Sequence, residues 1–256
     1  MKRLTTVLTV GFLAGLFNCG QKKSSDSTTP PITKLVQNIT PTKDQLERRA
    51  RSEAICIARQ IPVYKNQNSL FVDPEAKVTI RTQDEVVDRA LALCYIGLKS
   101  EGLEQKHLDQ MDKDFHITAK MTASEKNYAT TLQPTEQQKI DANWRYESLH
   151  VLLWALGYVE KLNFPDQMCN VGDDVKIIYN LKEKKFRQNA RLRTKNEILD
   201  EADLILRLHW ACVDARMKNE SAPGGLNSSI VYERHYSLNW LIKFMDQEWD
   251  KVTTDT

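Results

Sequence analysis

The amino-acid sequence predicts one all-α domain over residues 41–256. Apolar residues recur at intervals of three and four in several long segments, capping boxes mark the starts of some of them, and the prolines after residue 40 fall between them. Apolar residues make up 41% of the chain and charged residues 27%, which argues against a disordered chain and against a multi-span membrane protein. One short stretch, residues 77–81, alternates like a β-strand.

The chain begins with a pattern typical of an export signal. Lys2 and Arg3 precede an uncharged, largely apolar stretch over residues 4–17, and the sequence turns polar directly after Cys19. Such a stretch is too short for a permanent membrane anchor. We therefore expect residues 1–18 to be a signal peptide. The alternative is a buried N-terminal helix in which Cys19 has no role.

The end of this stretch resembles the lipobox of bacterial lipoproteins. It reads Leu16-Phe17-Asn18-Cys19, in which Phe17 and Asn18 are bulkier than the small residues usual before the Cys. We expect Cys19 to carry lipid, and two or more acyl chains hold a protein stably on a membrane. The resemblance implies an exported bacterial protein, anchored on the periplasmic or cell-surface side.

Residues 19–40 are expected to form a flexible tether. They are rich in Lys, Ser, Thr, Asp and Pro, and are too polar to bury themselves. A coil of roughly 20 residues spans about 25 Å, enough to hold a domain clear of the lipid headgroups.

The charge balance argues against nucleic acid as a partner. The chain has 36 Lys and Arg against 34 Asp and Glu, and two of the basic residues lie in the leader. The mature chain would therefore be formally neutral, and it has no basic run of the kind that binds a phosphate backbone.

Three helices are predicted in the first half of the domain. Between Pro41 and Pro62 a helix is expected to bury an apolar face made of Leu46, Ala50, Ala54, Ile57, Ala58 and Ile61. Thr82 and Glu85 form a capping box before a helix whose apolar face is Val86, Val87, Ala90, Leu91, Cys94 and Leu98. Thr122 and Glu125 form another box before a shorter helix.

Three further helices are predicted in the second half. The segment 135–162 is apolar on every side from Leu149 to Leu156 apart from His150, which indicates a central helix covered all round. A second helix is expected over about 194–218, and a third over 229 to about 249, after the Pro223-Gly224-Gly225 turn. Short links between buried helices favour an all-α fold.

These C-terminal helices resemble a bacterial family named domain of unknown function 4272. The likeness covers about residues 41–256 and is most specific in the last half. It is carried by Trp144-Arg145, Glu147, Leu149, Leu152-Leu153-Trp154-Ala155-Leu156-Gly157, Leu192-Arg193, Glu197-Ile198-Leu199-Asp200, Asp203-Leu204-Ile205, Arg207, Trp210-Ala211, Asp214-Ala215-Arg216, Glu233-Arg234-His235 and Leu238-Asn239-Trp240-Leu241. The resemblance implies a single domain and brings no assigned activity.

Charged residues on the C-terminal helices are candidates for a functional cluster. On the 194–218 helix a polar stripe runs beside the apolar face, and the spacing of Asp203 and Arg207 allows an ion pair. The candidate cluster comprises Arg145, Glu147, His150, Arg193, Asp203, Arg207, Asp214, Arg216, Glu233, Arg234 and His235. The plainer interpretation is a solvated face or a structural network between helices.

His235 is the candidate acid or base, because it lies near the buried face beside Glu233 and Arg234. No nucleophile motif accompanies it, so a hydrogen-bonded core histidine is the alternative.

No metal site or cofactor is expected. Glu147-x-x-His150 and Glu104-x-x-His107 match the spacing of di-iron bundles, but the surroundings of Glu104 are too polar and two further Glu-bearing helices are not evident. The remaining thiols, Cys56, Cys94, Cys169 and Cys212, are spaced too widely to define a disulfide framework. One bridge would be compatible with export, and none is required.

These observations lead to two hypotheses for function. The first is a membrane-tethered binding or interaction module, whose partner beyond the membrane is an unidentified protein or small molecule. The second is a hydrolase built around Glu233, Arg234 and His235 with the stripe of Asp203, Arg207 and Asp214. An enzyme requires these groups to converge in a pocket within hydrogen-bond reach.

Overall fold

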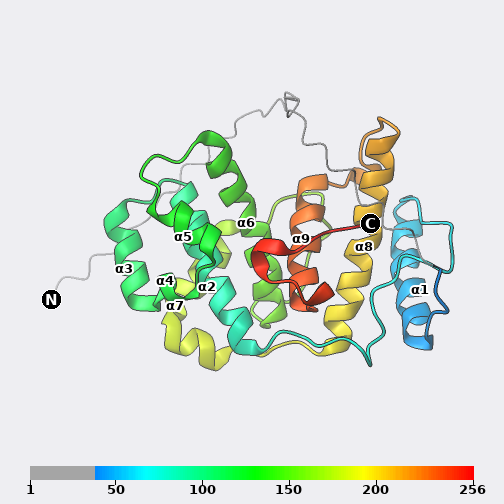
Figure 1. Cartoon of the computed structure of the whole chain (residues 1–256), viewed down its shortest axis with the longest axis horizontal. Helices are drawn as coiled ribbons and strands as arrows, with labels where there is room; N and C mark the ends of the chain where they lie inside the picture. Colours follow the sequence, from blue (N-terminus) through cyan, green and yellow to red (C-terminus); the bar gives the residue numbers. More distant parts are fainter. Residues whose placement is uncertain (1–37) are drawn as a thin grey trace. The chain divides into compact units, whose positions relative to one another are not determined.

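The computed structural model describes residues 38–256 (Figure 1). The expected signal peptide, the lipid attachment at Cys19 and nearly all of the expected tether lie outside the described residues. Within residues 38–256 the chain forms nine α-helices and three short 3₁₀ turns and contains no β-strand. The predicted all-α class is therefore confirmed.

The helices and turns have the following bounds: α1 Lys43–Ala58, α2 Gln83–Ser100, α3 Gln105–Phe115, α4 Ile117–Lys120, α5 Ala123–Thr130, α6 Glu136–Ala155, α7 Val171–Asn189, α8 Lys195–Met217 and α9 Ser228–Leu241, with 3₁₀ turns at Pro223–Gly225, Phe244–Asp246 and Trp249–Lys251. The core is a succession of packed neighbours in which α2 contacts α6, α6 contacts α9, α9 contacts α8 and α8 contacts α1 (Figure 1). In the described part of the chain, no helix is both long enough and apolar enough to cross a membrane.

Two predicted helix starts and the predicted central helix are confirmed. The Thr82 and Thr122 side chains each accept a hydrogen bond from the backbone N–H three residues on. In return, the carboxylates of Glu85 and Glu125 accept from the backbone N–H groups of these two threonines. Helix α6 is buried on all sides from Tyr146 onward, because its apolar run lies between α2 and α9. The face predicted for α2 is buried as well.

The strand predicted at residues 77–81 is wrong. Val78 N donates to Pro74 O in a turn, and Arg81 N donates to Leu241 O at 2.9 Å. The Arg81 guanidinium also donates to Trp240 O. This segment therefore satisfies carbonyls at the end of α9, where a helix leaves such groups without partners.

The last helix is shorter than predicted. It ends at Leu241 rather than near residue 249, and Lys243, Met245 and Asp246 follow with positive φ. Residues other than glycine rarely adopt this left-handed backbone conformation, and a right-handed helix cannot continue through it. The chain after α9 instead forms two separate 3₁₀ turns.

Helix α1 buries the opposite face from the one predicted. Leu46 and Ile57 are 49% and 64% exposed, whereas Arg48, Arg49 and Cys56 are buried. Of the predicted apolar face only Ile61, which follows the end of the helix, is buried. Arg49 donates to the carbonyls of Tyr64, Asn66 and Ser69 and pairs with Glu53 at 2.6 Å. The polar face is buried because the loop after α1 presents these carbonyls to it.

We expect Arg49→Met to lower the free energy of unfolding by about 3 kcal/mol, because it leaves buried carbonyls and Glu53 without their partner. Ile57→Gln on the exposed face should change it by less than about 0.5 kcal/mol. Urea unfolding followed by circular dichroism measures both. Equal losses for the two variants would show that α1 is packed the other way round.

Candidate functional site

The predicted candidate residues do not form one cluster. Ten of the eleven have a side-chain partner: Arg145 with Glu233, Glu147 with Arg234, Asp203 with Arg207, Arg193 with Glu197, Asp214 with Lys218, His150 with Asp174 and His235 with His209. The predicted ion pair on α8 is present, with Arg207 Nη2 2.8 Å from Asp203 Oδ1. Among the described residues only Arg216 of this set has no hydrogen-bonded or ion-pair partner.

The innermost pair joins α6 to α9. Glu147 is 0% exposed and Arg234 is 2% exposed, and Arg234 Nε donates to Glu147 Oε2 at 3.0 Å. The other carboxylate oxygen of Glu147 accepts from the backbone N–H of Cys169 at 2.6 Å, and Arg234 donates to Asn163 O. The pair therefore fixes the 163–169 loop against the two helices.

A second pair joins the same helices with opposite polarity. Arg145 on α6 donates to Glu233 on α9 at 3.1 Å, and Ser148 Oγ donates to the same carboxylate oxygen at 2.8 Å. Burial raises the pKa of Glu233, and the charge of Arg145 and the Ser148 bond oppose that rise. Glu233 also borders a cleft.

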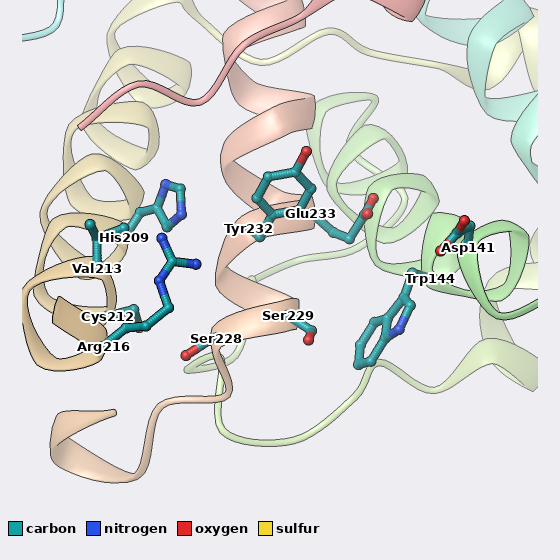
Figure 2. Close-up of a pocket in the computed structure, with 10 residues that line it drawn as sticks. All are labelled: Asp141, Trp144, His209, Cys212, Val213, Arg216, Ser228, Ser229, Tyr232 and Glu233. Carbon is teal, nitrogen blue, oxygen red and sulfur yellow. The ribbon is translucent and has the colours of Figure 1, made fainter. Parts of the chain in front are cut away.

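This cleft has a volume of about 330 Å³ and lies among α6, α8 and the start of α9 (Figure 2). Its walls are Asp141 and Trp144 from α6, His209, Cys212, Val213 and Arg216 from α8, and Ser228, Ser229, Tyr232 and Glu233 from α9. Pockets for small molecules begin at about this size.

Opposite charges stand on opposite walls of the cleft. Figure 2 shows Arg216 on α8 with its side chain extended toward His209, while Asp141 and Trp144 lie on the far wall. Asp141 accepts from Gln137 and has no cationic partner among the described residues. The cleft thus offers a cation, two carboxylates, hydroxyl groups and aromatic surface to one ligand.

A neutral histidine pair closes the inner end of the α8 wall. His209 Nδ1 and His235 Nδ1 lie 2.8 Å apart, so one ring donates to the other. Burial, with a smaller effect of Arg216, lowers the pKa of His209 to about 4, and burial holds the pKa of His235 well below its ordinary value. Sequence reasoning missed His209, which lies in an apolar run without a motif.

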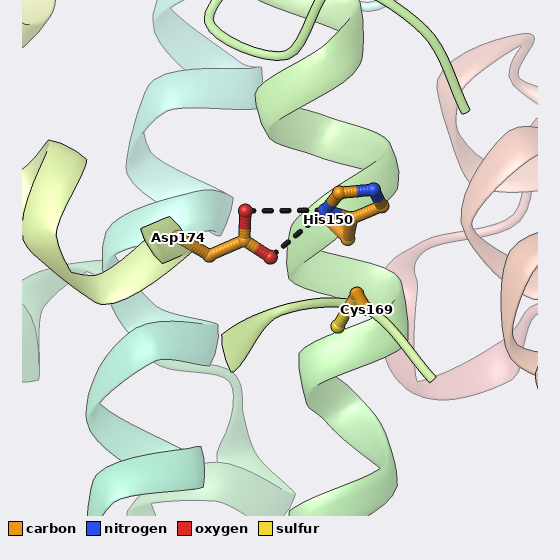
Figure 3. A group of neighbouring side chains, drawn as sticks. All are labelled: His150, Cys169 and Asp174. Carbon is orange, nitrogen blue, oxygen red and sulfur yellow. Dashed lines mark hydrogen bonds and ion pairs between the residues drawn. The ribbon is translucent and has the colours of Figure 1, made fainter. Parts of the chain in front are cut away.

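On the α2 and α7 side of α6 lies a third group, His150, Cys169 and Asp174 (Figure 3). His150 Nδ1 is 2.9 and 3.1 Å from the two Asp174 oxygens, and a nitrogen of His150, the Cys169 sulfur and an Asp174 oxygen lie within 4.8 Å of one another. Burial, Glu147 and Asp174 raise the pKa of the Cys169 thiol. The only signal in the sequence is faint: Cys169 is followed, at the start of a helix, by the acidic residues Asp173 and Asp174.

The other thiols carry no bridge. Cys56, Cys94, Cys169 and Cys212 are all free in the described part of the chain. Cys56 and Cys94 are fully buried, as small apolar side chains would be.

The neutral histidine pair makes stability fall in mild acid. His209 binds a proton less readily in the folded chain, with a pKa of about 4, than in the unfolded chain, at 6.5. Stability is therefore complete above the unfolded pKa and is lost as pH falls below it. The free energy of urea unfolding should fall as the pH drops from about 6.5 to about 4, and His209→Gln should reduce that fall. His107→Gln, on exposed α3, is the matched control, and an unchanged slope in His209→Gln would contradict this account.

Comparison with known proteins gives a family and no activity. No curated protein and no solved structure matches the chain. One family model matches residues 48–252, which include every helix that forms the cleft and the buried pairs. The chain therefore belongs to the family described as domain of unknown function (DUF4272).

Proposed function

We propose that this protein is an exported lipoprotein, held on the membrane through Cys19, whose helical domain binds a small zwitterionic ligand in the cleft of α6, α8 and α9. One observation carries the binding proposal. Arg216 has no described partner and lines a cleft of about 330 Å³ whose opposite wall holds the carboxylates of Asp141 and Glu233.

The chemistry of the walls defines the class of ligand. Arg216 with the hydroxyls of Ser228 and Ser229 suits a carboxylate, since a guanidinium forms strong charge-assisted hydrogen bonds with it. Asp141 suits an ammonium group at the other end, and Trp144 and Tyr232 provide flat apolar surface. Free amino acids and short peptides combine these features at the size of the cleft.

The hydrolase alternative has no comparable support. The groups it needs are engaged elsewhere: His235 bonds His209, Arg234 bonds Glu147, and Glu233 bonds Arg145 and Ser148. A nucleophile activated by a base requires the two within hydrogen-bond reach. In residues 38–256, none of the hydrogen bonds that these histidines make goes to a serine, threonine or cysteine.

Arg216→Ala should weaken ligand binding without unfolding the protein, because Arg216 is exposed and has no internal partner. The test is thermal unfolding of the purified protein with a panel of free amino acids and dipeptides. At least one should raise the melting temperature, and the variant should bind it at least about tenfold more weakly, as expected for a lost charged hydrogen bond.

Arg191→Ala is the matched control, since Arg191 bonds only backbone carbonyls near itself and does not line the cleft. It should bind like the wild type. If no member of the panel binds, or if Arg216→Ala binds normally, the binding proposal fails.

The tether proposal is tested separately. Cys19→Ser should remove the lipid and move the protein from the membrane fraction to the soluble fraction of the native cells, because the acyl chains supply the membrane affinity. Mass spectrometry of the wild type should show loss of residues 1–18 and acyl chains on Cys19. An intact Met1–Asn18 segment, or an unmodified thiol, would refute it.

A further inference from the structure

We propose that His150, Cys169 and Asp174 form a binding site for one zinc-class divalent metal ion. The site is separate from the cleft and does not depend on the proposed ligand. It departs from the expectation from sequence, because the Glu147-x-x-His150 spacing contributes only His150, while the other ligands come from the loop before α7 and its first turn.

The geometry suits a tetrahedral ion. A nitrogen, a sulfur and a carboxylate oxygen lie within 4.8 Å of one another. Ligand atoms around tetrahedral zinc are about 3.3 to 3.8 Å apart, given its bond lengths of about 2.0 Å to N or O and 2.3 Å to S. His150 Nδ1 lies 2.9 Å from Asp174 Oδ2. These two atoms need to move apart by only a few tenths of an ångström for both to bind the ion.

The charges favour a divalent cation. Asp174 is buried, and the only side chain paired with it in the described residues is His150. A buried carboxylate without a full counter-charge is costly. Zinc bound by one carboxylate, one thiolate and a neutral imidazole gives a group of zero net charge, which removes that cost.

The identity of the ligands selects the class of metal. Magnesium and calcium take oxygen ligands, whereas a set that includes sulfur and nitrogen suits zinc and its cobalt substitute. Three protein ligands leave the fourth position of the ion open to water, which is the arrangement of catalytic zinc sites.

The surrounding structure holds the ligands in place. Glu147 accepts from the backbone N–H of Cys169 at 2.6 Å, and the Cys169 sulfur contacts Tyr146 O at 3.6 Å. Asn170 caps α7 by accepting from Asp173 N, which sets the turn that carries Asp174. Glu147 is thus a positioning residue for the thiol, and such outer partners tune metal affinity.

The test uses the full-length chain, purified in detergent, stripped with a chelator and titrated with Co²⁺. We expect one Co²⁺ per chain, tetrahedral visible bands and a near-ultraviolet thiolate-to-cobalt band. Cys169→Ser should remove the thiolate band, and Asp174→Asn should weaken Zn²⁺ binding at least about tenfold in competition with a chromophoric chelator. Cys56→Ser, which removes a buried thiol of α1 outside the group, should behave like the wild type.

The result that overturns the proposal is a folded wild type with no thiolate band, or a band that survives in Cys169→Ser. Circular dichroism checks that each variant folds. If Cys169→Ser does not fold, X-ray absorption of the zinc-loaded wild type decides: one sulfur with nitrogen and oxygen ligands supports the site, and a shell of oxygen alone refutes it.

Discussion

The buried ion pair between Glu147 and Arg234 is the constraint on which the rest of the structure depends. A carboxylate that is 0% exposed requires a partner in place, because breaking such a pair costs about 3 to 5 kcal/mol. The pair fixes the distance and rotation of α6 against α9, and its remaining bonds hold Cys169 and Asn163. The cleft on one side and the His150 group on the other are both built on this frame.

The apolar parts of the fold could be predicted from the sequence, and the polar parts could not. Helices α2 and α6 were predictable because burial on every side leaves an apolar run whatever the neighbours are. Helix α1 was predicted with the wrong face inward, because the residues that pack include Gln45 and Arg49, and their burial depends on carbonyls supplied by the loop after the helix. The periodicity of hydrophobic residues does not reveal a buried face that is made of polar side chains.

The same limit applies to the candidate sites. The spacing of Asp203 and Arg207 predicted their pair, since both lie on one helix. His209, Cys169 and Asp174 were missed because each acquires its role from a residue on another element, and a single sequence does not reveal contacts of that kind. Helix α7, which carries Asp174, was also not predicted, and it buries only Asp174, Ile178 and Phe186.

The charges that remain unbalanced within this network indicate where ligands belong. Glu147 cancels Arg234, Arg145 cancels Glu233 and Asp203 cancels Arg207, so these pairs need nothing from outside. Arg216 at the cleft has no partner among the described residues, and Asp174 is paired only with a histidine. One requires an anionic group and the other a cation. Arg216 stands on α8 and Asp174 on α7, and these helices pack against α9 and α6, the two helices that the Glu147 pair joins. A ligand at either place would therefore stabilise the frame that holds the other.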